Sequence, residues 1–136
     1  MMVYSAAYAG ALATLVVADM IWLGSMVSRV YRPTLGDILL SGVNLPPAIV
    51  FYLLYPVGVL IFAVAPALKN GSPTDAIVSG ALFGFFAYTT YDLSNYATLR
   101  NWTLQLTIID IAWGTLLGAM TAAAGFLLAT KVDGMG

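Results

Sequence analysis

Long, nearly uncharged apolar runs are the feature that most limits what this chain can fold into. Only 8% of its 136 residues are charged and 61% are hydrophobic, whereas a soluble globular domain carries about 25% charged residues. So little charge cannot cover a surface that faces water, and an integral membrane protein is therefore expected. A spanning helix needs about 20 mostly apolar residues. Four stretches qualify: about 4–27, 45–68, 73–99 and 103–130.

The connections between these stretches are short, which predicts an all-α fold: an up-down bundle of four helices forming one transmembrane domain over residues 1–136. The sizeable connection is 28–44, whose leucines and isoleucine favour a segment lying partly in the membrane interface.

Basic residues near the helix ends predict the orientation of the bundle, because cytoplasmic connections carry more Lys and Arg. Three arginines lie at one end and two lysines at the other. This small excess favours the arginine end in the cytoplasm and both termini on the non-cytoplasmic side. The residues are Arg29, Arg32 and Arg100 at one end, and Lys69 and Lys131 at the other.

The residue types that are missing exclude several kinds of chemistry. Without cysteine or histidine there are no thiolate metal sites, and the usual haem, copper and zinc ligands are absent. A net charge of −1 with five scattered basic residues offers no footprint for nucleic acid. We therefore expect no metal, no cofactor and no nucleic-acid partner.

Three aspartates lie inside the predicted helices: Asp19, Asp92 and Asp110. At a rise of 1.5 Å per residue, each lies roughly 10–15 Å from the arginine end of the bundle. One such aspartate is often a structural hydrogen-bonding group. Three at one depth, each costing about 2.5–3.5 kcal/mol to insert, favour a shared polar site.

The helical faces agree with this interpretation, since Asp92 and Asp110 each lie on a stripe of small and hydroxyl residues that marks the interior of a membrane bundle. Tyr52 and Tyr55 share a helix face at the same end. The predicted ligand-binding residues are Asp19, Trp22, Tyr88, Tyr91, Asp92, Asn95, Asp110 and Trp113.

The first and last helices share a D-x-x-W pattern, Asp19 with Trp22 and Asp110 with Trp113. Because these helices run antiparallel, the pattern is compatible with a trace of an inverted repeat, as in some transporters. Coincidence is the simpler interpretation. The two tryptophans line a pocket or anchor the bundle at the interface, and the latter is the role expected of Trp102.

The strings LFGFFAYTTYDLSNYATLRNW, LTIIDIAWG, ADMIWLG and FYLLYPVGVLIFAVAPAL together resemble a bacterial family of small four-span membrane proteins classified as a domain of unknown function. Its hallmark is a YDL(T/S)N motif in the third helix, which matches residues 91–95 here. The resemblance covers nearly the whole chain. It implies a bacterial inner-membrane location and four spans, and it implies no reaction.

The leading functional hypothesis is a pocket for a small apolar or amphipathic molecule such as a lipid or isoprenoid. Clustered carboxyl groups away from water cannot all ionise. A protonated and an ionised carboxyl group together could bind a hydroxyl or an amine, or exchange a proton with the substrate. Whether the protein is an enzyme stays open.

Two alternatives remain. A proton-coupled transporter would use the same groups and, with so few helices, would need a homodimer. A structural accessory subunit of a larger membrane complex would use the aspartates to hold helices together. A continuous polar path toward the lysine end would favour transport, but the apolar run 15–17 beside Asp19 argues against one. A fully packed interior would favour the structural role.

Overall fold

The computed structural model describes residues 1–135, and within them the chain is almost entirely helical, with no strand. The all-α prediction is confirmed. In chain order the elements are α1 (Met2–Met26), a π-helical turn (Val27–Tyr31), α2 (Arg32–Leu35), a 3₁₀ turn (Gly36–Ile38), α3 (Leu45–Val59), a second π-helical turn (Leu60–Val64), α4 (Ala65–Asn70), α5 (Pro73–Thr98) and α6 (Leu104–Met135).

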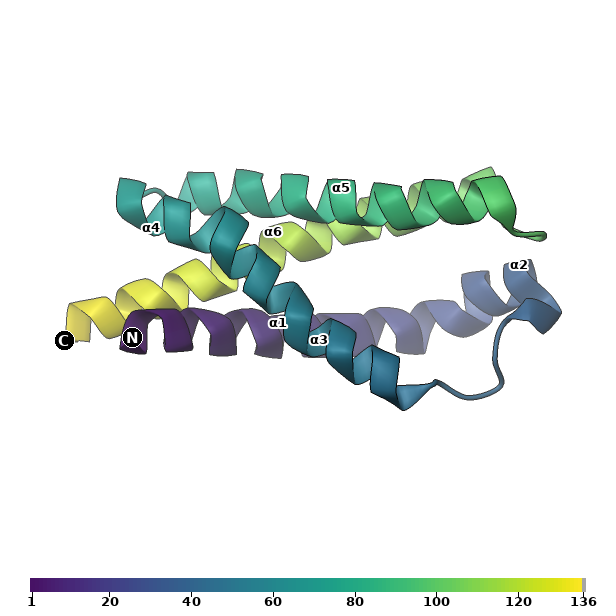
Figure 1. Ribbon diagram of the computed structural model, residues 1–136, viewed down its shortest axis with the longest axis horizontal. Helices are drawn as coiled ribbons and strands as arrows, with labels where there is room; N and C mark the ends of the chain where they lie inside the picture. Colours follow the sequence, from purple (N-terminus) through teal and green to yellow (C-terminus); the bar gives the residue numbers. More distant parts are fainter. Residues whose placement is uncertain (136) are drawn as a thin grey trace.

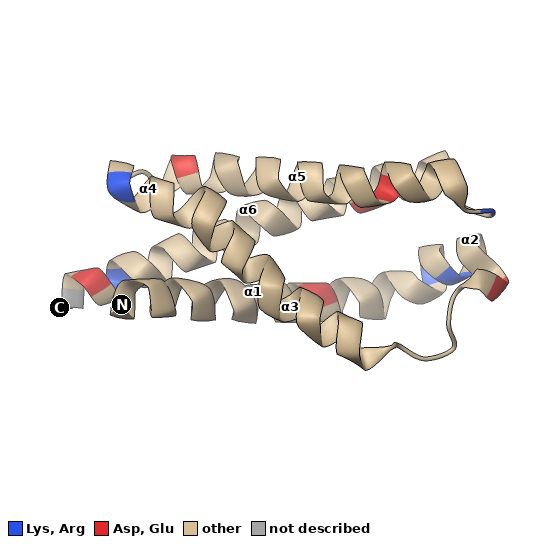
Figure 2. Cartoon of the chain, in the orientation of Figure 1, with Lys and Arg blue, Asp and Glu red and all other residues tan. Residues whose placement is uncertain are grey.

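The helices form an antiparallel bundle in which α6 packs along both α1 and α5. Both termini and the connection from α4 to α5 lie at one end, and α2 lies at the other (Figure 1). The path from α3 to α4 crosses the bundle obliquely (Figure 1). Lys and Arg lie only at the two ends (Figure 2).

Three helical stretches are long and apolar enough to cross a membrane: Met2–Ile38, Leu45–Asn70 and Leu104–Gly134. The fourth predicted span, α5, is more polar because its second half carries the motif of residues 91–95. Its 26 residues extend about 39 Å, enough to cross a hydrocarbon core of about 30 Å. The crossing of α5 stays a prediction, favoured by this length and by its packing along α6.

The connection expected at 28–44 differs from the structure, because helix continues from α1 as far as Ile38. The irregular backbone is confined to residues 39–44. Helix is maintained here although Pro33 lies within it, and the same holds for Pro66 further along the chain.

Each π-helical turn ends two residues before one of these prolines. A proline lacks an N–H, and its ring collides with the carbonyl group four residues earlier. For Pro33 and Pro66 those carbonyls belong to Arg29 and Phe62, which lie inside the two π-helical turns. A wider turn at that point accommodates the proline without ending the helix.

Glycines allow α5 and α6 to approach closely. A Cβ atom on Gly84 would collide with the carbonyl oxygen of Gly114, and one on Gly80 with the carbonyl oxygen of Gly118. Small residues four apart on facing helices are typical of contacts inside a membrane, where close backbone packing replaces the hydrophobic effect. This contact fixes the position of α5 relative to the aspartate of α6.

Trp102 belongs to a small second core and is not the exposed interface anchor expected from the sequence. Its side chain is buried and packs with Leu35 and Leu106. Its indole N–H donates to Thr107 Oγ1 at 3.0 Å. This cluster attaches α2 to the start of α6 at the arginine end of the bundle.

Candidate functional site

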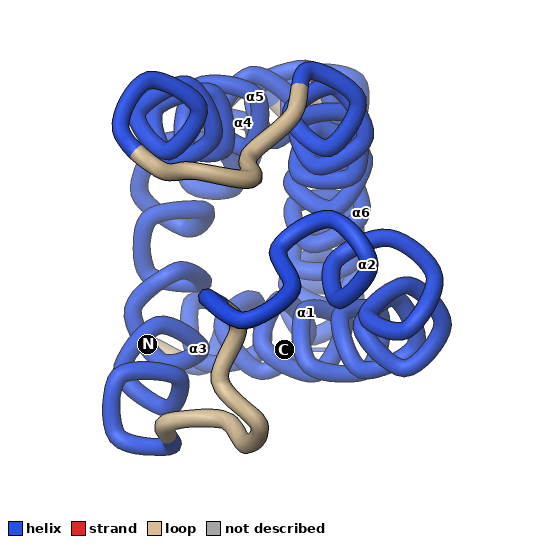
Figure 3. Tube along the Cα trace, turned by 90° about the vertical axis from the view of Figure 1, so that its right-hand side faces the viewer, coloured by secondary structure: helices blue, strands red, loops and turns tan. Residues whose placement is uncertain are grey.

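A cavity of about 770 Å³ lies in the arginine half of the bundle, between α1, α3, α5 and α6. In Figure 3, which looks along the bundle from this end, α2 and the connection to α3 lie nearest the viewer, on the side of α1 and α3. Residues 38–44 and Trp102 form this part of the wall. Six predicted site residues line the cavity: Asp19, Trp22, Tyr88, Tyr91, Asp110 and Trp113.

The two D-x-x-W patterns meet at the centre of the site. The rings of Trp22 and Trp113 stack with centroids 4.5 Å apart and planes within 4° of parallel. Trp113 Nε1 donates to Asp19 Oδ1 of the opposite helix at 3.3 Å. Each helix therefore supplies one ring and one carboxyl group to a single cluster.

The second tryptophan reaches the opposite aspartate through a tyrosine. Trp22 Nε1 donates to the hydroxyl oxygen of Tyr31 at 3.0 Å, and that hydroxyl donates to Asp110 Oδ1 at 2.5 Å. The arrangement is approximately reciprocal between α1 and α6. It gives the repeated pattern a structural role, whether the repeat arose by duplication or by coincidence.

Asp19 has a second donor from α3, the hydroxyl of Tyr52, at 2.5 Å from Oδ2. Another tyrosine of α3, Tyr55, is buried on the cavity wall, and its hydroxyl has no hydrogen-bond partner among the described residues. A buried hydroxyl without a partner is costly. The site thus contains a polar group that the described residues do not satisfy.

Tyr88 lines the same cavity as Asp19 and Asp110. Its ring occupies the space that a side chain at position 114 would fill, since a Cβ atom on Gly114 would overlap it. The glycine contact between α5 and α6 therefore also seats an aromatic ring in the cavity wall.

The YDLSN motif is only partly on the cavity. Tyr91 lines it, whereas Asp92 and Asn95 do not. Asp92 is 0% exposed and neither of its carboxyl oxygens has a hydrogen-bond partner among the described residues. The carboxyl group of Asp110, on α6, lies beside it, so that a proton on one of the two acids can be donated to the other. A direct contact of Asp92 or Asn95 with a ligand stays a prediction.

Sequence reasoning did not place Tyr31, Tyr52, Tyr55 or Trp102 among the site residues. Tyr52 and Tyr55 carried a signal, since they share a helix face at the depth of the aspartates. Tyr31 carried none, because its position depends on α1 continuing beyond residue 27 through a π-helical turn.

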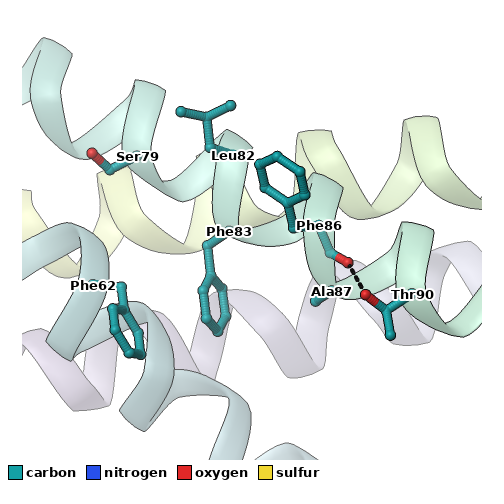
Figure 4. A pocket seen from close by; sticks show the side chains of 7 residues that line it. All are labelled: Phe62, Ser79, Leu82, Phe83, Phe86, Ala87 and Thr90. Atoms are coloured by element: carbon teal, nitrogen blue, oxygen red, sulfur yellow. Dashed lines mark hydrogen bonds between the residues drawn. The ribbon is translucent and has the colours of Figure 1, made fainter.

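A shallower hollow of about 490 Å³ lies on the outer side of α5, with Phe62 at its rim. Figure 4 shows Thr90 within it donating to the carbonyl oxygen of Phe86, a bond of 2.7 Å that satisfies the hydroxyl locally. Apart from Ser79 and Thr90 its lining is apolar, and the hollow resembles ordinary lipid-facing surface. In the described part of the chain no three His, Cys, Asp or Glu side chains are placed to hold a metal ion.

Comparison with known proteins gave one family match. No curated protein and no solved structure is significantly similar to this chain. A family described as "Predicted membrane protein (DUF2177)" matches residues 4–127. Because this match covers most of the sequence, including every aromatic and acidic residue of the cavity described above, the chain belongs to the DUF2177 family of predicted membrane proteins.

Proposed function

We propose that this membrane protein binds a small amphipathic molecule, of the lipid or isoprenoid type, in the cavity at the arginine end of the bundle. The observation that carries the proposal is a mostly apolar cavity that contains two buried carboxyl groups, Asp19 and Asp110, on its wall. Ligand sites typically combine an apolar lining with a few polar groups that fix orientation.

The size and lining of the cavity suit such a molecule. About 770 Å³ lies within the range of about 300–1,000 Å³ usual for small-molecule sites. Its wall from α2 to the start of α3 is mostly apolar, with Leu35, Leu39 and Phe51, and also includes Arg32, Ser41 and Asn44. The carboxyl groups lie on α1 and α6, deeper in the bundle. An apolar body would thus occupy the outer part, and a polar head would meet the aspartates.

A purely structural role for the aspartates fits these observations less well. If the aspartates only held the helices together, their carboxyl groups would be packed against hydrogen-bond partners in a closed interior. Here Asp19 and Asp110 face a cavity, and the unsatisfied hydroxyl of Tyr55 lies on the same wall. These groups supply hydrogen-bonding capacity that a bound molecule would use.

Native mass spectrometry of the protein extracted from its membrane tests the proposal by asking which molecules stay bound. Ala48, half-buried on the cavity wall in the first turn of α3, is the position to fill. The Ala48→Phe variant should lose the molecule that the unsubstituted protein retains. Ala97→Phe, on the exposed side of α5 and away from the cavity, is the matched control and should retain it.

Equal retention by both variants, with their melting temperatures unchanged, would contradict the proposal. So would a protein that carries nothing bound out of membranes and takes up no amphiphile when amphiphiles are added.

A further inference from the structure

We infer that the head group recognised in this cavity is a cationic amine, held between Asp19 and Asp110 with the apolar chain directed toward residues 38–44. This inference rests on the proposed function and specifies the chemical class of the ligand. It is carried by the charge of the site, by its aromatic walls and by the hydroxyl of Tyr55.

The buried acids lack a visible counter-charge. Asp19 is 7% exposed and Asp110 is 6% exposed, and the side chains that donate to them are neutral: Tyr52, Trp113 and Tyr31. All five basic residues are exposed and belong to segments at the ends of the bundle (Figure 2). One of them, Arg32, lines the cavity, but it is not among the side chains that donate to Asp19 or Asp110. A buried carboxylate without a cation is costly in a membrane, and a ligand ammonium would supply the missing charge.

Aromatic rings surround the same space. The stacked pair of Trp22 and Trp113 forms one part of the wall, and Tyr55 and Tyr88 form another. An ammonium group is attracted to the faces of such rings, and the attraction is stronger where water is excluded. A carboxylate or phosphate head placed between the two aspartates would instead be repelled by them and by the ring faces, and would be attracted only toward Arg32 on the cavity lining.

The hydrogen-bonding capacity that remains also fits an ammonium. Asp19 accepts one bond on each oxygen, and Asp110 accepts one on Oδ1, whereas a carboxylate can accept about four. The hydroxyl of Tyr55, 7% exposed and without a partner among the described residues, can accept one more. A primary ammonium has three N–H donors, and an alcohol has one.

Three amphiphiles with the same twelve-carbon chain test the inference: dodecylamine, dodecanol and dodecanoate. Each is titrated into the protein in nanodiscs of zwitterionic lipid, and binding is followed by the fluorescence of the tryptophans on the cavity wall. The amine should bind at least tenfold more tightly than the alcohol, and the carboxylate should not bind. Empty nanodiscs correct for partition into lipid.

Substitutions test which residues cause the tighter binding of the amine. Asp19→Asn and Asp110→Asn should each weaken amine binding about tenfold and leave alcohol binding within about twofold, whereas Asp75→Asn, exposed at the start of α5, should change neither. Tyr55→Phe removes a hydroxyl that bonds to no described residue, so the variant should fold normally. It should weaken binding of the amine more than binding of the alcohol.

The outcomes separate this inference from the function on which it rests. If amine and alcohol bind equally, or if Tyr55→Phe and both Asp→Asn variants fold and bind the amine as before, the inference is wrong while an amphiphile site remains. If none of the three amphiphiles binds and Ala48→Phe has no effect on retention, the proposed function itself is wrong.

Discussion

At the scale of single residues, Asp92 differs from the other two buried aspartates because no described residue donates to either of its carboxyl oxygens. Asp19 and Asp110 each accept hydrogen bonds from aromatic side chains. An unsatisfied buried polar group costs about 1–3 kcal/mol, and a charged one costs more. Asp92, the acid of the YDLSN motif, is therefore the buried aspartate with the fewest hydrogen-bond donors around it.

Asp92→Asn should leave the free energy of unfolding unchanged or raise it by about 1 kcal/mol, since an amide of similar shape cannot ionise and its NH₂ group can donate toward Asp110. Denaturation in mixed micelles, followed by circular dichroism, measures this. Asp110→Asn is the comparison and should lose about 1 kcal/mol, because the bond from Tyr31 would no longer be charge-assisted. A larger loss for Asp92→Asn than for Asp110→Asn would show that Asp92 has a stabilising partner.

At the scale of helices, the closest contact in the bundle is that between α5 and α6, and it depends on glycine. Gly80 and Gly84 face Gly118 and Gly114 so closely that no side chain fits. Gly24, in α1, has no atom within 4 Å of the place where its Cβ would lie. The two kinds of glycine have opposite expected responses to the same substitution.

Gly84→Ala should destabilise the bundle by about 1–3 kcal/mol through overpacking. Gly24→Ala should be neutral, or stabilising by up to about 1 kcal/mol, because alanine favours helix. Unfolding of both variants in the same micelles tests the difference. Similar free energies of unfolding for the two variants would mean that α5 and α6 are not held together by this contact.

The helices themselves could be predicted from apolar length, and the inward faces of α5 and α6 from small residues at steps of three and four. The helical structure from Val27 to Ile38 could not be predicted from the sequence, because two features there have opposite effects on the helix. Pro33 indicates an end of helix, and the π-helical turn before it removes the clash that would enforce that end. Trp102 was missed because its burial depends on α2, which this extended helix positions.

At the scale of the whole molecule, the distribution of basic residues favours one orientation in the membrane only slightly. Arg29, Arg32 and Arg100 lie at one end, and two lysines lie at the other. Loops richer in Lys and Arg stay in the cytoplasm. A difference of one charge is a weak determinant of insertion.

A C-terminal alkaline phosphatase fusion should therefore be active, since that enzyme folds only after export, and the matching green fluorescent protein fusion should be dark. Replacing Arg29 and Arg32 by Gln leaves one basic residue against two and should lower phosphatase activity and raise fluorescence. A fluorescent C-terminal fusion of the unsubstituted protein would place both termini in the cytoplasm instead.

The irregular segment from Leu39 to Asn44 has a kinetic consequence. It is mostly exposed, it forms part of the cavity wall, and the backbone hydrogen bond outside the helices that involves it joins the N–H of Leu39 to the carbonyl of Gly36. The aspartates lie on the long helices α1 and α6. Opening of this segment would therefore set how fast a molecule enters and leaves, while the helices set how tightly it is held. Gly42→Pro should slow association and dissociation by similar factors, so that residence time lengthens at nearly constant Kd.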